Sequence, residues 1–227
     1  MIFNLKNIPL PDYSPAEDRV NSITHAIGVP MYLVGAFFLL RLQNGRASGV
    51  QSFSTVIYLL STLLVFATSA VYHGLKPGFH KQVARALDHS NIYLMISGNV
   101  TAFYLAHVYQ AAPTLSVSLI VLVWILSAAG ILLTFMDLKR FNIPQIFMYV
   151  LLGWIAVFGM RSVNAGGDAD RAFLHAVILG GICITVGAAI YFVGKKVRYF
   201  HALFHLFVLA GNWIIFLGTY RYYDTIL

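Results

Sequence analysis

The sequence predicts an all-α integral membrane protein, a single bundle of seven transmembrane helices. Three observations predict this class. Of the 227 residues 59% are hydrophobic, only 10% are charged, and the charged residues fall between long uncharged runs. A soluble domain averages roughly 25% charged residues, whereas a helix of ~20 apolar residues can cross a bilayer core. The composition therefore excludes an ordinary soluble domain.

The uncharged runs define the spans in chain order. Five runs suit one span each, but the run from 89 to 136 would be ~72 Å long as one helix. We divide it near Gln110–Pro113, because proline disfavours helix in the residue before it and is well tolerated at a helix start. The expected spans are 22–42, 53–74, 89–109, 114–136, 143–162, 172–193 and 200–221, within one membrane domain covering 1–227.

The distribution of basic residues predicts the orientation in the membrane. The net charge of +7 could indicate nucleic-acid binding, but ten of the fifteen Lys and Arg fall in the amino terminus and the loops after spans two, four and six. Lys81 and Arg85 are counted in the first of these loops. Basic residues favour the cytoplasmic side. We therefore expect a cytoplasmic N-terminus, an external C-terminus, contacts with anionic lipid headgroups and no nucleic-acid partner.

Polar residues at the expected cytoplasmic ends of three helices indicate a metal site. His201 and His205 are four residues apart, so they share one face of the seventh helix. Ser69 and His73 have the same spacing at the end of the second helix, and Asp88 is expected in the first turn of the third. Three histidines and a water are a common arrangement for catalytic zinc.

The other two residues of this set have candidate chemical roles. Asp88 could bind the metal directly, or hold and deprotonate its water. Ser69 could orient His73 or donate a hydrogen bond to an oxygen that gains negative charge. The segment HALFH has Ala202 where the HExxH metalloproteases need glutamate. The base must therefore come from another helix, and Asp88 is the candidate.

A second polar stripe opens the first helix. Glu17, Asn21 and His25 follow one another at a spacing of four residues, so they share one side of a helix. From the cytoplasmic end, this stripe could support the metal ligands from behind. It could equally belong to a helix that begins in the membrane interface and satisfies its own polar groups there.

Each feature also has a purely structural explanation. A histidine pair at an interface can be structural, Asp88 could cap its helix, and Ser69 could bond to a carbonyl of its own helix. His89 projects about 100° away from Asp88 on the same helix, so we leave it out of the site. The arrival of three motifs at one membrane depth favours the metal site.

These motifs resemble the haemolysin III branch of the progestin and adipoQ receptor (PAQR) family, in the wider group that includes alkaline ceramidases. The resemblance covers nearly the whole chain and rests on EDRVNSITHAIG, SAVYHG, RALDHSNIYLMISGNVTAFYL, GGICITVGAAIYFVGK and RYFHALFHLFVLAG. It implies seven helices with an inward N-terminus and a zinc ion on His73, His201 and His205. It places Asp88 against the metal or its water, and Ser69 beside it. The short N-terminus is similar to bacterial members, which implies a bacterial plasma membrane.

Three functions compete on this basis. Family members are linked to hydrolysis of lipid amides such as ceramide, so the first is a zinc-dependent hydrolase of a lipid amide or ester near the cytoplasmic leaflet, with the lipid in an intramembrane cavity. The second is a non-enzymatic sensor or regulator of membrane homeostasis with a structural zinc. The third, a pore-forming haemolysin, is disfavoured because few charged residues lie within the spans. A catalytic zinc keeps an exchangeable water, whereas a structural zinc usually has four protein ligands.

Overall fold

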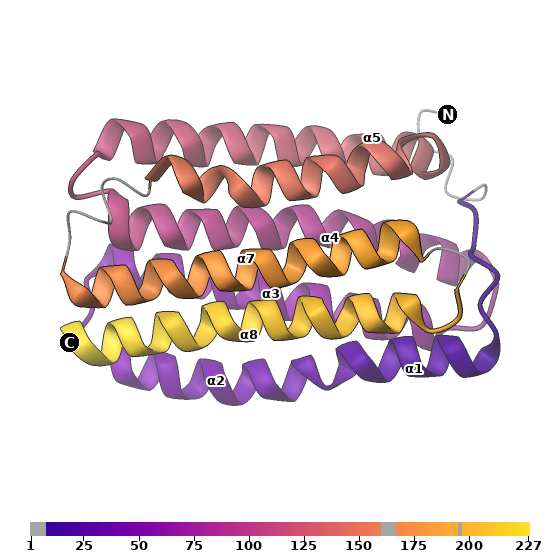
Figure 1. The fold of residues 1–227 in the computed structure, drawn as a ribbon, viewed down its shortest axis with the longest axis horizontal. Helices are drawn as coiled ribbons and strands as arrows, with labels where there is room; N and C mark the ends of the chain where they lie inside the picture. The colour runs from indigo at the N-terminus through magenta and orange to yellow at the C-terminus, as the bar shows by residue number, and fades with distance from the viewer. Residues whose placement is uncertain (1–7, 160–166, 195–196) are drawn as a thin grey trace.

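The computed structural model describes residues 8–159, 167–194 and 197–227, and every regular element in these ranges is helical. The elements are α1 (Pro15–Ala26), α2 (Gly28–Gln43), α3 (Gly49–Gly74), α4 (Phe79–Phe103), a π-helical turn η2 (Tyr104–Val108), α5 (Pro113–Gly153), a 3₁₀ segment η3 (Trp154–Gly159), α7 (Asp168–Val193) and α8 (Phe200–Ile226). Figure 1 shows them lying along one another in an elongated bundle, with the start of α1 and the end of α8 at opposite ends.

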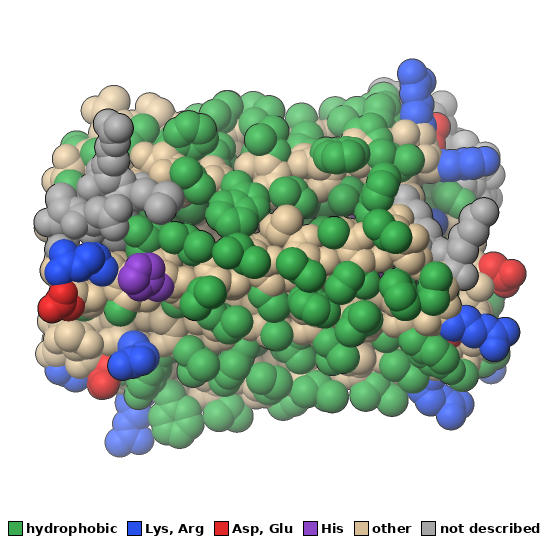
Figure 2. Space-filling model, viewed as in Figure 1, with side chains coloured by type: hydrophobic (Ala, Val, Ile, Leu, Met, Phe, Trp, Pro, Cys, Tyr) green, Lys and Arg blue, Asp and Glu red, His purple; other side chains and the backbone are tan. Residues whose placement is uncertain are grey.

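The surface of the bundle is that of an integral membrane protein. Five helical stretches among the described residues are long and apolar enough to cross a membrane: Pro15–Gln43, Gly49–Gly74, Pro113–Gly159, Asp168–Val193 and Phe200–Ile226. Figure 2 shows hydrophobic side chains over the middle of one face, with charged side chains gathered at its two ends. An apolar band between polar ends matches the hydrocarbon core and the two interfaces of a bilayer.

Two helix breaks fall where the sequence predicts them. The π-helical turn η2 ends at Val108 and α5 begins at Pro113, which confirms the division near Gln110–Pro113. Asp137 has non-helical angles (φ −160°, ψ 85°) and separates two helices within α5. Its Oδ1 atom accepts a 2.9 Å hydrogen bond from the Arg140 N–H, as an N-cap side chain does. Figure 1 shows α5 doubling back along the bundle at this break.

Helix α4 extends beyond the span expected from the sequence. It begins at Phe79, ten residues before the expected start at 89. Asp88 is therefore in the third turn rather than the first, and the cap explanation for it is wrong. Lys81 and Arg85 were expected in a loop, but they lie in α4 with only 3% and 6% of their surfaces exposed. Counting charges between apolar runs misses such a helix, because its basic side chains point into the protein.

Two close helix contacts fix the elements that carry the candidate site. Gly180 of α7 faces Gly211 of α8: a Cβ on either would lie 2.6–2.7 Å from the other's carbonyl oxygen. No larger side chain fits there, which allows the tight backbone approach typical of small residues between membrane helices. Helix α1 packs against both α3 and α8. The end of α3 and the beginning of α8 are therefore held together under α1.

Candidate metal centre

Three histidines from two helices meet at one end of the bundle. His73 lies in the last turn of α3, and His201 and His205 lie in the first two turns of α8. One nitrogen from each ring belongs to a group whose members all lie within 4.8 Å of one another, so the three could hold a metal ion. The Nε2 atoms of His73 and His201 are 3.1 Å apart. Two ring nitrogens at that distance need a proton or a cation between them.

The outer nitrogens of two of these rings are already engaged. His73 Nδ1 lies 3.0 Å from Asp18 Oδ1, and His205 Nδ1 lies 3.1 Å from the carbonyl oxygen of Asn21. A carboxylate or carbonyl oxygen only accepts hydrogen bonds, so each Nδ1 carries the proton and donates. The Nε2 atoms then keep a free lone pair, as a metal ligand requires. The donor set and its supporting hydrogen bonds therefore fit a metal ion.

Asp18 connects the His73 ring to a buried lysine. Its Oδ2 atom accepts a 2.5 Å hydrogen bond from Lys81 Nζ, and Lys81 also donates to the Leu75 carbonyl oxygen at 3.0 Å. The lysine holds the carboxylate charged and in place, and the carboxylate orients the His73 ring. Neither residue was among the candidates from the sequence. Asp18 could have been found, because it precedes His25 by seven residues, nearly two whole helical turns.

The predicted stripe on α1 lies beside the histidines but does not act as one unit. Asn21 reaches His205 through its backbone carbonyl, and its side-chain amide has no hydrogen-bond partner among the described residues. The His25 ring stacks on the His205 ring, with centroids 3.7 Å apart. Glu17 forms a capping box with Ser14 instead of contacting a histidine.

Glu17 nevertheless acts on the start of α8. Its Oε1 atom accepts a 3.4 Å hydrogen bond from the Tyr199 N–H. Tyr199 has φ +63°, a left-handed conformation that is uncommon outside glycine. The bond stabilises this turn, and the turn sets the direction in which His201 leaves the backbone two residues later.

Asp88 and Ser69 lie next to the cluster, in the wall of a cavity of about 200 Å³ that His201 and His205 also line. The Asp88 carboxylate is not part of the ligand group found within 4.8 Å. The Ser69 hydroxyl is buried and makes no hydrogen bond of normal geometry within the described residues. His89, left out at the sequence level, lines the same cavity. His89 and Asp88 project about 100° apart around α4, and both line the cavity because it extends over a broad face of that helix.

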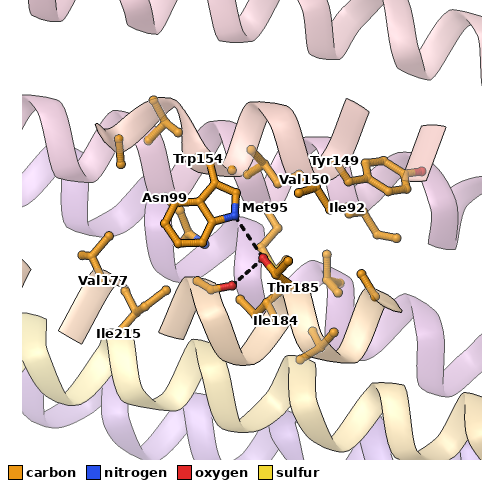
Figure 3. Close-up of a pocket in the computed structure, with 18 of the residues that line it drawn as sticks. Ile92, Met95, Asn99, Tyr149, Val150, Trp154, Val177, Ile184, Thr185 and Ile215 are labelled. Carbon is orange, nitrogen blue, oxygen red and sulfur yellow. Dashed lines mark hydrogen bonds between the residues drawn. The ribbon is translucent and has the colours of Figure 1, made fainter. Parts of the chain in front are cut away.

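Away from the histidines, Asp88 and Ser69 the wall of this cavity is mostly apolar. It runs between α4, the second half of α5, α7 and α8, and Figure 3 shows Ile92, Met95, Val150, Val177, Ile184 and Ile215 around it. The polar link across it is a 3.0 Å hydrogen bond from Trp154 Nε1 to Thr185 Oγ1 (Figure 3). Along α8 the lining extends from His201 to Thr219, about 27 Å at 1.5 Å per residue.

Tyr13 covers the cluster from the opposite side. Its ring stacks on His201 with centroids 5.3 Å apart and lies 5.8 Å from the His73 ring. Burial raises the pKa of the Tyr13 phenol well above its ordinary value, so this side chain stays neutral beside the imidazoles. The three histidines are thus enclosed by helices on one side and by the neutral Tyr13 ring on the other.

These features define a class: an integral membrane helical bundle with a buried three-histidine centre at one end. The chain belongs to the haemolysin-III related family, whose model matches residues 13–216.

Curated relatives agree with this assignment. The chain is 32% identical to the hemolysin-3 homolog of Bacillus subtilis (strain 168), over 88% of this chain and 91% of that protein. It is 30% identical to hemolysin-3 of Bacillus cereus, with 88% and 89% covered. The human monocyte to macrophage differentiation factor is 23% identical, with 92% and 87% covered. The similarity to bacterial and animal relatives therefore covers most of this helical bundle.

Proposed function

We propose that this protein is a zinc-dependent hydrolase that cleaves a lipid amide or ester near the cytoplasmic leaflet of a bacterial plasma membrane. One observation carries the proposal: the three-histidine cluster lies at the end of an apolar cavity whose wall also holds Asp88 and Ser69. A hydrolase for membrane lipids needs these parts together: metal ligands, a base, a hydrogen-bond donor and a space for an acyl chain.

The proposal includes a single domain with seven passes and a cytoplasmic N-terminus. Pro113–Gly159 has 47 residues, about 70 Å as one helix, and its break at Asp137 supports two passes. Helix α4 with η2 supplies a further pass, which begins with charged side chains that the protein buries. Without Lys81 and Arg85, the proposed cytoplasmic side still has eight basic residues against five, so the charge bias keeps its direction.

Reporter fusions test this topology. Gly45 lies between α2 and α3, and Gly78 lies between α3 and α4. We expect a fusion after Gly45 to report the outside and a fusion after Gly78 to report the cytoplasm, because one membrane pass separates them. A fusion after Ala112, the residue before α5, serves as a second external point. Reporters at Gly45 and Gly78 on the same side would contradict the seven-pass bundle.

Zinc is the metal that this donor set favours in the proposal. Three neutral imidazoles form a common catalytic zinc site that leaves one position open. Zinc bound there supplies Lewis acidity, which activates water and polarises a carbonyl group. Asp18 and the Asn21 carbonyl hold the His73 and His205 rings in the tautomer that offers Nε2. Among the described residues no fourth His, Cys, Asp or Glu joins the group, which favours a catalytic over a structural site.

Asp88 is the base in this proposal, and Ser69 is the hydrogen-bond donor. The Asp88 carboxylate lies outside the ligand group but in the same cavity, which supports a role in accepting a proton from the attacking water over a role as a metal ligand. The Ser69 hydroxyl is buried and interacts with the Asp88 carboxylate. In the proposal it turns from Asp88 to the substrate carbonyl oxygen and donates to that oxygen as it gains negative charge.

The apolar cavity holds the acyl chain of the substrate. Helix α7 packs closely on α8 but makes only sparse contact with α5, and the cavity lies along this loosely packed side (Figure 3). A lipid chain can enter there from the bilayer without crossing a polar surface. Its scissile carbonyl would stop at the histidine end, where the polar groups are.

Metal-dependent turnover is the direct test of the proposed function. We expect the purified protein, loaded with zinc, to hydrolyse a long-chain lipid amide or the matching ester in detergent micelles. Stripping the metal with a chelator should abolish turnover, and adding back zinc should restore it, because in this proposal zinc activates the water and polarises the carbonyl group. Product is measured by mass spectrometry. Hydrolysis that continues unchanged after verified metal removal would contradict a zinc-dependent reaction.

A further inference from the structure

A second cavity lies on the other side of the histidines. Its volume is about 690 Å³, and it opens between the segment before α1, the first turns of α1 and α4, the second half of α5 and the start of α8. Its lining includes Asp12, Tyr13, Glu17, Asn21, Arg85, Asn142, Arg198 and His201. His201 lines both cavities. A polar compartment and an apolar compartment therefore meet at the candidate metal centre.

Arg85 is a buried cation in the wall of this polar cavity. Only 6% of its surface is exposed, and its Nε atom is fully enclosed with no hydrogen bond. The ion pairs found among the described residues involve other groups. A buried charge is costly unless it is paired. Buried polar groups that lack partners in a protein point to a water, an ion or a ligand at the site.

Two side-chain amides line the same space. The Asn21 side chain, 1% exposed, has neither its Nδ2 nor its Oδ1 atom hydrogen-bonded within the described residues, and the half-buried Asn142 lines the same cavity. Side-chain amides can donate hydrogen bonds to an anion. Arg85, Asn21 and Asn142 come from three helices, so their convergence on one cavity requires the folded bundle.

The acidic residues of this cavity do not neutralise Arg85. The Glu17 carboxylate already accepts hydrogen bonds from the Ser14 N–H and hydroxyl and from the Tyr199 N–H, and its charge is attracted by Arg198. Asp12 is exposed to solvent. Asp88, three residues further along α4, attracts the Arg85 charge, but the two do not form one of the ion pairs found among the described residues. The cavity beside Arg85 therefore has room for a further anion.

We propose that this cavity binds the phosphate of a lipid headgroup, with Arg85 as the main contact and Asn21 and Asn142 beside it. The planar guanidinium presents donors in a fork that matches phosphate oxygens. Because His201 lines both cavities, a lipid with its phosphate at Arg85 has its scissile carbonyl close to the histidines and its acyl chain directed toward α4, α5 and α7. Under the proposed function, on which this step rests, the substrate is a phosphate-bearing lipid and not a neutral one.

Lipid binding without turnover tests this site. We would titrate purified protein in detergent with a short-chain phosphatidic acid, with the matching neutral diacylglycerol and with inorganic phosphate alone. Wild-type protein should bind phosphatidic acid at least about tenfold more tightly than diacylglycerol, as expected for charge-assisted hydrogen bonds to a buried Arg. Arg85→Gln should lose that preference and keep its zinc, while Arg85→Lys should retain part of it. Arg19→Gln, at an exposed position of α1, is the matched control and should behave as wild type.

The outcomes separate this site from the hydrolase. Equal binding by wild type and Arg85→Gln would overturn the proposal, and so would competition by free phosphate as strong as that of the lipid. Loss of zinc in a folded Arg85→Gln protein would assign Arg85 to the metal centre and also overturn it. If Arg85→Gln does not fold, Arg85→Lys is the deciding variant. It should show a smaller preference for phosphatidic acid over diacylglycerol than the wild type, and an unchanged preference would overturn the proposal. Absence of hydrolysis leaves these binding results unchanged, so the two proposals fail separately.

Discussion

Replacing both His201 and His205 by alanine should remove zinc from the purified protein, from about one ion per chain to a level close to none. The two residues supply two of the three ring nitrogens that meet in the cluster. Neutral imidazoles are the main anchors of such a site, and a single remaining histidine, His73, cannot hold the ion against a chelating buffer. Metal analysis of folded, size-purified protein measures the loss. His73→Ala alone should reduce zinc strongly.

Two further variants make this result specific. His175→Ala removes an exposed histidine from the opposite end of the bundle and should leave zinc unchanged. Asp18→Asn keeps all three ligands but removes the carboxylate that orients His73, so we expect about 10- to 100-fold weaker metal affinity. If the wild-type protein and the double-histidine variant hold equal zinc, the cluster is not a metal site.

Asp88→Asn should abolish most turnover while zinc is retained. Asparagine keeps the size and hydrogen bonding of the side chain but cannot accept the proton of the attacking water. A positioned general base contributes typically 10²- to 10⁴-fold, and we expect a fall in kcat of that order. Since the carboxylate lies outside the ligand group, zinc per chain should remain close to the wild-type value.

The comparison of zinc with turnover separates the two leading functions. Asp224→Asn, at an exposed position near the end of α8, is the matched control and should retain full activity. Under a regulator with structural zinc, Asp88→Asn would act only through thermal stability or metal affinity. Turnover equal to wild type in a zinc-loaded Asp88→Asn protein would rule out Asp88 as the base.

The sequence predicts the helix breaks and the histidine cluster because both depend on local patterns. Pro113 marks a helix start through its own backbone, and the i, i+4 spacing of His201 and His205 puts both on one face of a single helix. The third ligand, His73, was found by the depth at which its helix ends. The membrane depth of a helix end can be predicted without tertiary information, because an apolar run ends where its helix leaves the hydrocarbon core.

The partners of the cluster could not be predicted in the same way. A spacing of four selects Glu17 and omits Asp18, although Asp18 and His25 lie within about 20° on a helix wheel and Glu17 and His25 about 80° apart. The buried start of α4 was not predicted, because charged residues such as Lys81 and Arg85 between two apolar runs are typical of a loop. Only the packed structure shows that Lys81 pairs with Asp18 and that Arg85 faces a cavity.

X-ray absorption at the zinc edge, on the purified protein, tests the central claim most directly. The claim is that His73, His201 and His205 hold a zinc ion with one position left for water. We predict three nitrogen ligands at about 2.0–2.1 Å and one exchangeable oxygen ligand, with the nitrogen signal lost in the double-histidine variant. A sphere closed by a fourth protein ligand would contradict a catalytic site, and protein that binds no zinc would contradict the metal centre itself.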